Sequence, residues 1–227
     1  MKRLNSEDAL FLLEKDIINC EDDYYKPQNR WIWHSIYTGE AAGRIASKLG
    51  LNEDRAKALG YVHDIGRKID HERHVLEGYY YLQELGYIED SGVCLTHSFV
   101  NNDVNLVAGG LIDEKRQLFF AQYFLEHSCS IYDNIVQMCD LFCLDTGFTT
   151  VEKRLLDIYK RKGVFSNTAA HLESAMFLKE SLEGAMGCSL YSLFPEMSQN
   201  DLNNVEQDYS ELLDMLDKTK KSEKMHK

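Results

Sequence analysis

Apolar residues recur along this chain mostly at intervals of three and four, and strict alternation of apolar and polar residues is scarce. Intervals of three and four place apolar side chains on one face of an α-helix, whereas alternation is typical of a half-buried strand. Only two prolines occur, Pro27 and Pro195, and the runs between them favour helix. The pattern therefore predicts an all-α protein.

Capping residues divide the chain into separate helices. Asn52 precedes a helix whose first turn is acidic, and the pairs Ser130 with Asp133 and Thr149 with Glu152 have the spacing of a capping box. Glycines follow several of the apolar runs and mark helix ends. The expected helices span residues 6–19, 31–49, 53–66, 71–85, 91–97, 113–127, 131–143, 149–163, 167–185 and 199–217.

The organisation of the chain follows from the breaks between these helices. Residues 20–30 and residues 98–112 are the least regular stretches, and we expect both to be loops, the second beside the functional site. We expect one all-α domain over residues 1–197. Residues 198–227 are expected to be a C-terminal amphipathic helix followed by a charged, disordered tail, and the helix could pack on its own domain or form a homodimer.

Charge and composition exclude several function classes. Acidic residues outnumber basic residues by 37 to 25, a formal net charge of −12, so we expect no nucleic-acid partner. The charged N-terminus and the lack of a long apolar window predict no signal peptide, no membrane contact and a cytoplasmic location. The six cysteines show neither a CxxC pair nor a disulfide-framework spacing, so we expect free and mostly buried thiols.

The most informative stretch is residues 60–70, which read GYVHDIGRKID. His63 and Asp64 stand next to each other there, and apolar neighbours predict that both are buried. Adjacent helical residues point about 100° apart, and both can still reach one metal ion at a helix end. Further candidate ligands follow in order along the chain, namely His34 upstream and His74, His97 and Asp140 downstream.

The types of donor atom narrow the choice of metal, and more than one aspartate could be the last ligand. A mixture of imidazole and carboxylate ligands suits Fe, Mn, Co, Ni or Zn, and the sequence does not choose among them. Asp133 and Asp145 compete with Asp140 as the last ligand, although Asp133 is better explained as a helix-start residue. His171 reads as a surface residue, and Arg154 could contact a substrate, although a solvated helix face explains it more simply.

This ordered set resembles the HD-domain metal-dependent phosphohydrolase superfamily, and the run HDIG is a variant of its signature. The resemblance covers about residues 30–160 and implies an HD-type helical bundle. With the two extra histidines, His74 and His97, the set resembles the branches of the superfamily that use two metals, namely the dinucleoside tetraphosphate hydrolases and the cyclic-dinucleotide phosphodiesterases. This resemblance implies one metal on His34, His63, Asp64 and Asp140, and a second on Asp64, His74 and His97.

The resemblance also implies a function. It predicts hydrolysis of a phosphate ester or anhydride by metal-activated water, with a nucleotide such as a dinucleoside polyphosphate or nucleoside phosphate as the expected substrate. Asp64 and Arg67 would be catalytic, and Arg67 and Lys68 would bind the phosphorylated small-molecule substrate. Arg67 replaces the lysine that often follows HDIG, and the spacing from the doublet to His74 is short, so the resemblance fixes no particular substrate. The alternative is an HD-fold sensor that binds metal and nucleotide without turnover.

Overall fold

The computed structural model of the chain describes residues 2–17, 29–109 and 113–225, with side chains up to residue 218. It confirms the all-α class, since the sheet structure among these residues is one two-stranded antiparallel hairpin. That hairpin, β1 Cys143–Leu144 and β2 Gly147–Phe148, was not expected from the sequence. Residues 18–19 of the first expected helix, residues 20–28 of the expected loop and residues 110–112 lie outside the described residues.

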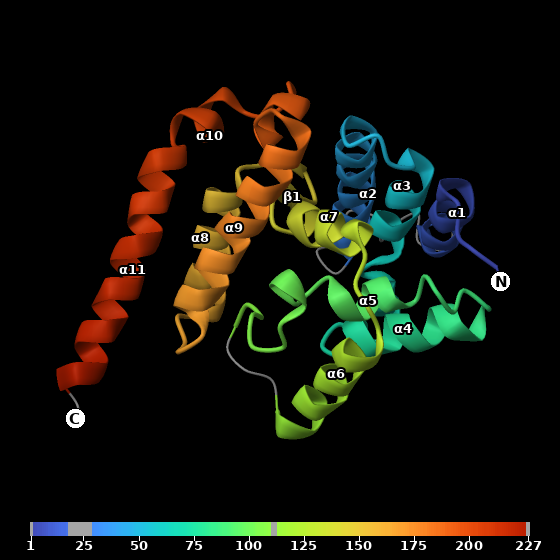
Figure 1. Cartoon of the computed structure of the whole chain (residues 1–227), viewed down its shortest axis with the longest axis horizontal. Coiled ribbons are helices and arrows are strands. Elements are labelled where there is room, and N and C mark those ends of the chain that lie inside the picture. Colours follow the sequence, from blue (N-terminus) through green and yellow to red (C-terminus); the bar gives the residue numbers. More distant parts are fainter. Residues whose placement is uncertain (1, 18–28, 110–112, 226–227) are drawn as a thin grey trace.

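The helices follow the predicted order, with short 3₁₀ segments (η) between some of them (Figure 1). Up to residue 102 they are α1 Ser6–Ile17, α2 Arg30–Lys48, α3 Glu53–Val62, η2 Ile65–Lys68, α4 His74–Glu84, α5 Gly92–Thr96 and η3 Val100–Asn102. From residue 114 they are α6 Glu114–Glu126, α7 Ile131–Asp140, α8 Val151–Lys162, α9 Thr168–Met186, η4 Leu190–Leu193, α10 Gln199–Asn203 and α11 Val205–Met225.

Two of the predicted helix starts are confirmed in atomic detail. The side chain of Asn52 accepts a hydrogen bond from the backbone N–H of Arg55 at 3.0 Å, which caps α3. Ser130 and Asp133 form a capping box at α7, in which the Asp133 carboxylate accepts the Ser130 N–H at 2.7 Å. These bonds satisfy backbone donors that the first turn of a helix leaves unpaired.

The predicted capping box at Thr149 is wrong by one residue. Thr150 is the cap of α8, since its hydroxyl accepts the Lys153 N–H at 3.3 Å. The Thr149 hydroxyl instead donates to the Asp201 carboxylate at 2.7 Å, and Glu152 accepts a hydrogen bond from the Tyr191 hydroxyl. Thr149 is thus held by Asp201, a contact from far along the chain that a local motif cannot reveal.

A close contact between α2 and α3 brings distant parts of the sequence together. A Cβ atom added to Gly60 on α3 would lie 2.6 Å from the Cα of Gly39 on α2, so neither position has room for a side chain. The backbones of the two helices are therefore in direct contact at this point. The apolar residues around the contact belong to the main hydrophobic core. As a result the start of α2 lies beside the end of α3.

The helix α7 crosses the middle of the molecule and contacts α2, α3, α5 and α9 (Figure 1). Its buried residues Ile135, Val136, Met138 and Cys139 belong to the main core, and Asp140 is the last residue of the helix. A smaller apolar cluster, formed around Phe99 and Phe120, holds α6 below α5. The end of α7 therefore faces the junction of α2, α3, α4 and α5.

The C-terminal segment departs from one expectation. Helix α11 runs to Met225, whereas residues after 217 were expected to form a disordered tail. It packs along α8, where Leu212 and Leu216 are buried and Lys160 pairs with Glu211 at 2.8 Å. Its buried leucines therefore face the body of the protein, while Tyr209 and Leu213 of the same helix are exposed.

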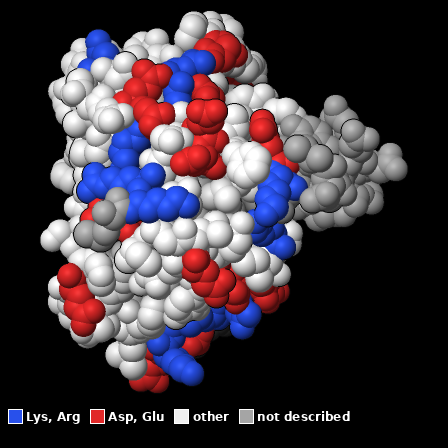
Figure 2. Space-filling model, turned by 90° about the vertical axis from the view of Figure 1, so that its right-hand side faces the viewer, with Lys and Arg blue, Asp and Glu red and all other residues white. Residues whose placement is uncertain are grey.

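Of the described cysteines none forms a disulfide, and Cys94, Cys139 and Cys143 are fully buried, as expected. Among the described residues, no helix is both long enough and apolar enough to cross a membrane. The net negative charge does not form a continuous field on the face shown in Figure 2, where basic and acidic side chains gather in small separate groups.

Candidate metal centre

The pair His63–Asp64 lies at a break between two helical segments. Helix α3 ends at Val62, His63 follows as its C-terminal cap, and η2 begins at Ile65. Asp64 has φ −103° and ψ 10°, in the sparsely populated bridge region where many active-site residues lie. This turn lets two adjacent side chains face the same interior space, and both are buried.

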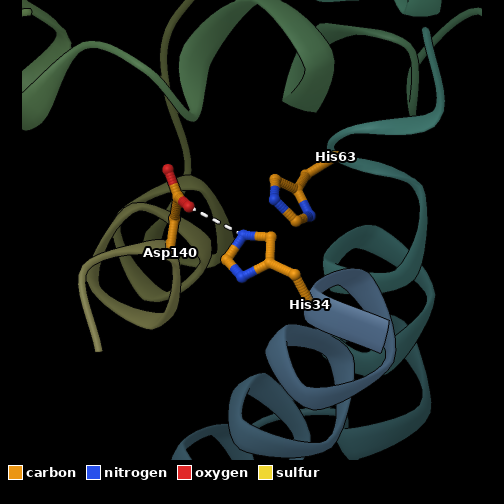
Figure 3. Close-up of side chains that lie close together, drawn as sticks. All are labelled: His34, His63 and Asp140. Carbon is orange, nitrogen blue, oxygen red and sulfur yellow. Dashed lines mark hydrogen bonds and ion pairs between the residues drawn. The ribbon is translucent and has the colours of Figure 1, made fainter. Parts of the chain in front are cut away.

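A first group of potential ligands comprises His34, His63 and Asp140, whose donor atoms lie within 4.8 Å of one another. Figure 3 shows how they converge from the first turns of α2, the end of α3 and the end of α7. His34 Nε2 lies 2.9 Å from Asp140 Oδ1. Of the rival aspartates, Asp133 is engaged in the capping box, and Asp145 pairs with Arg30 at 3.3 Å.

A second group comprises Asp64, His74 and His97, again with donor atoms within 4.8 Å of one another. Asp64 Oδ1 lies 3.2 Å from His74 Nε2 and 3.5 Å from His97 Nε2. The other carboxylate oxygen of Asp64 lies 3.9 Å from His63 Nε2. Asp64 is thus placed between the two groups, with one oxygen on the side of each.

The two groups form one continuous centre. The imidazole rings follow one another at centroid separations of 5.2 Å from His34 to His63, 5.0 Å from His63 to His97 and 5.6 Å from His97 to His74. Six side chains from α2, the α3–η2 junction, α4, the end of α5 and α7 therefore meet in one place. The structure brings together every ligand that the sequence predicted.

Backbone carbonyls orient three of the four imidazoles. When Nδ1–H donates to a carbonyl, the lone pair of Nε2 is left to face the centre, as in histidines that bind metals. The three bonds run from Nδ1 of His63 to Gly60 O at 2.7 Å, of His74 to His71 O at 2.9 Å, and of His97 to Val93 O at 3.2 Å.

Three buried atoms of this centre have no hydrogen-bond partner, namely His34 Nδ1, His63 Nε2 and Asp64 Oδ1. A buried polar atom without a partner is costly, and acceptors that face one another, such as His63 Nε2 and Asp64 Oδ1, favour a cation between them. A mixture of imidazole nitrogens and carboxylate oxygens matches the preferences of divalent transition metals. The residues therefore fit one or two such ions, and none of the described cysteines takes part.

The local environment sets the protonation state that metal binding requires. Burial lowers the pKa of His63 to about 3 and that of His74 to about 4, so both imidazoles are neutral at neutral pH. Burial is also the largest influence on His97 and lowers its pKa, but the neighbouring Asp64 carboxylate and the negative charge of Asp140 together outweigh burial, so the pKa is raised. Burial opposes ionisation of Asp64, yet the charge of Arg67 holds its pKa well below the usual range.

The two basic residues of the HDIGRK run have different surroundings. Arg67 forms an ion pair with Asp64, its Nη2 lies 3.5 Å from His74 Nε2, and it lines the space over both groups. Lys68 lies instead with its Nζ 3.9 Å from the centroid of the Tyr81 ring and lines neither cleft. Neighbouring residues of the 3₁₀ segment thus point in different directions, and the substrate contact of Lys68 stays a prediction.

Two clefts open onto the centre. The first, of about 610 Å³, is bordered by His34, Asp64 and Asp140, and the second, of about 500 Å³, by His74, His97 and Asp140. Part of the irregular stretch expected to lie beside the site does border the second cleft, at Ser98, Val100, Val107 and Ala108.

The walls of both clefts include basic residues, among them Arg154, which the sequence offered as a substrate contact beside the simpler explanation of a solvated helix face, and others that it did not single out. Arg154 and Arg161 on α8 line both clefts, and Lys162 and His171 line the second. The expectation that His171 lies on the surface is wrong, because its side chain is buried against Tyr159. The spacing of Arg154 and Arg161, seven residues or about two turns, was a usable signal that they share one face of α8.

Fold and site together define a helical protein with two adjoining His/Asp metal groups, and comparison with known proteins agrees with this class. Residues 31–143 match the family described as HD domain. The chain therefore belongs to the HD-domain superfamily of metal-dependent phosphohydrolases, whose members bind divalent metals.

Similar curated proteins share only part of the chain. The chain is 37% identical to Ribonuclease Y of Lactobacillus helveticus over 91 residues, which make up 39% of this chain and 15% of that protein. It is 54% identical to Ribonuclease Y of Fervidobacterium nodosum over 39 residues, or 17% of this chain and 8% of that protein. Ribonuclease Y of Thermotoga maritima is 51% identical over 45 residues, or 20% of this chain and 8% of that protein. No solved structure matches the chain significantly.

Proposed function

We propose that this protein hydrolyses a phosphate ester or phosphoanhydride of a small nucleotide, with a divalent transition metal as cofactor. The observation that carries the proposal is the pair of adjoining ligand groups open to two clefts that share arginine residues. Its partner would be a phosphorylated small molecule. Metal ions, when bound, would supply an activated water and neutralise charge that develops on the phosphoryl oxygens.

The chain's own residues prepare the centre for this reaction. Neutral His63 and His74 keep their Nε2 lone pairs available, and the carbonyls on Nδ1 fix the ring orientation. Arg67 balances the charge of Asp64 and borders both clefts, so its guanidinium can also contact a phosphoryl oxygen. We propose Asp64 as a shared ligand between the two groups and Arg67 as the residue that positions the reacting phosphoryl group.

A second candidate is cleavage of a phosphodiester bond in RNA. It is favoured by the name of the relatives, Ribonuclease Y, one of which is 37% identical to 91 residues of this chain. Against it stands the acidic character of the chain, because RNA binding needs a continuous basic surface. In the first cleft, Asp145 and Asp157 interrupt the basic residues.

The test is a hydrolysis panel on protein loaded with Mn²⁺, Fe²⁺ or Zn²⁺. The panel contains a chromogenic phosphate ester, nucleoside phosphates, dinucleoside polyphosphates, cyclic dinucleotides and a labelled RNA oligomer. We expect turnover of a small nucleotide, and a loss of at least about 100-fold in His63→Gln, since losing one metal ligand removes the main electrostatic contribution. Arg116→Gln, at an exposed ion pair on α6, is the matched control.

Three results would count against the proposal. Turnover of RNA alone would favour the second candidate. Nucleotide binding by metal-loaded protein with no turnover of any substrate would identify a sensor. Equal activity in wild type and His63→Gln would place the reaction elsewhere in the molecule.

A further inference from the structure

Helix α8 presents two arginines to the metal centre from the opposite wall of the clefts. Arg154 and Arg161 are the basic residues of this helix that border both clefts, together with Asp140 and Arg67. Lys160, on the same helix, faces away and pairs with Glu211 of α11. One face of α8 therefore lies over the centre, and another packs on the C-terminal helix.

Arg154 is a cation that the protein itself leaves largely uncompensated. Its side chain is only 19% exposed, and its Nε is buried without a hydrogen-bond partner. The carboxylate it approaches is Asp157, at 3.7 Å, which is beyond hydrogen-bond distance. A half-buried guanidinium with an unused donor that borders a cleft favours an anion there.

Arg161 is held in place next to it. Its Nε and Nη2 both bond Asp157 Oδ2, at 2.9 and 2.7 Å, so one carboxylate fixes the guanidinium beside the cleft. Two groups extend the polar wall into the second cleft. Lys162 reaches Ala108 O at 3.3 Å, and His171 is oriented by the Tyr159 hydroxyl, which donates to its Nδ1 at 2.7 Å.

We propose that Arg154 and Arg161 bind a second phosphoryl group of the substrate, next to the one that reacts at the metal groups. This inference rests on the proposed function and narrows it to nucleotides with at least two linked phosphoryl groups. Two guanidinium groups beside one cleft can offer charged N–H donors to the oxygens of one phosphoryl group, with Arg161 held in place by Asp157. A substrate with one phosphoryl group would engage only the metal groups and Arg67.

The chemistry of such a substrate gives the subsite a role in the reaction. Hydrolysis of a phosphoanhydride consumes one water, whose oxygen forms a bond to the attacked phosphorus and whose proton is released. The bridging P–O bond breaks, and the leaving phosphate takes its electron pair. Arginines beside the leaving group stabilise the negative charge that it gains.

The experiment measures equilibrium binding of AMP, ADP and ATP to full-length protein with Mn²⁺ in excess. In the wild type we expect affinity to rise at least tenfold from AMP to ADP. In Arg154→Gln and in Arg161→Gln we expect this gain to fall below about threefold. Lys160→Gln is the matched control on the same helix and should keep the wild-type gain.

Several outcomes would overturn the subsite. It is excluded by equal wild-type affinity for AMP and ADP, by a full gain in both arginine variants, or by loss of the gain in Lys160→Gln. If Arg154→Gln does not fold, Arg161→Gln decides, because that side chain is 54% exposed. Failure of the proposed function is seen separately, as absent turnover of every substrate in the hydrolysis panel by metal-loaded wild type, and leaves the binding result standing.

Discussion

At the scale of single residues, the centre depends on a few positions where the backbone conformation or the space for a side chain is restricted. His63 and Asp64 face one space because the chain leaves α3 and enters η2 between them. Gly66 allows this turn to pack directly on α4, because a Cβ atom there would overlap the His74 carbonyl oxygen and the Gly78 amide nitrogen. The glycine of the HDIG run thus serves close backbone packing next to a ligand.

Gly66→Ala tests this packing. The added methyl group must push α4 away, so we expect a loss of about 1–3 kcal/mol in unfolding free energy, as for overpacked cores. Because α4 carries His74, metal binding by the second group should weaken as well. Denaturant unfolding and metal titration measure the two effects. Gly184→Ala is the control, since a Cβ there meets no atom within 4 Å; a loss of stability equal to that of Gly66→Ala would refute the packing argument.

The buried His171 predicts a pH dependence of stability. Burial lowers the pKa of His171 to about 4 in the folded protein, whereas the pKa of a histidine in an unfolded chain is about 6.5. Folding therefore favours the neutral imidazole. The contribution of His171 to the unfolding free energy is complete above about pH 6.5 and is lost as the pH falls toward 4. The expected loss is about 3 kcal/mol over this window.

Unfolding free energies between pH 7.5 and 4.5 measure this contribution. His171→Gln should reduce the slope below pH 6.5 by up to about 1.4 kcal/mol per pH unit. Identical slopes in the wild type and the variant would contradict the assignment of a buried neutral imidazole.

At the scale of elements, the ends of helices position the site. Ligands come from the first turns of α2 and α4 and from the ends of α3, α5 and α7, so the centre lies where five helices meet. Helix α8 closes the opposite wall. Its position depends on the Thr150 cap at one end and on packing with α11 along its length.

Thr150→Ala tests the start of α8. The variant loses the bond to the Lys153 N–H, and we expect a cost of about 1 kcal/mol in unfolding free energy. Thr150→Ser keeps an accepting hydroxyl and should recover most of this loss. If the serine variant is as unstable as the alanine variant, the hydroxyl does not cap α8 and the lost methyl group explains the effect.

At the scale of the whole molecule, local patterns predicted most of the fold. Apolar periodicity and capping residues predicted the order of the described helices. The order of candidate ligands along the sequence predicted the residues that the structure brings together, namely His34, His63, Asp64, His74, His97 and Asp140. The burial of His171 and the position of α8 opposite the ligand groups could not be predicted, because each depends on contacts between different helices. The β-hairpin is local, with Cys143 paired to Phe148, but strands of two residues are too short to show alternation in the sequence. The boundary at residue 197 and a homodimer through α11 stay predictions.

The central claim is that two adjoining ligand groups each hold a metal ion. Metal content per chain, measured on protein purified without a metal-affinity tag and reconstituted with Mn²⁺, Fe²⁺ or Zn²⁺, tests it most directly. We expect about two equivalents in the wild type, about one in His34→Ala and in His74→Ala, and none retained in Asp64→Ala, which lies between the groups. One equivalent in the wild type, unaffected by His74→Ala, would reduce the second group to a structural role, and no metal at all would contradict the account.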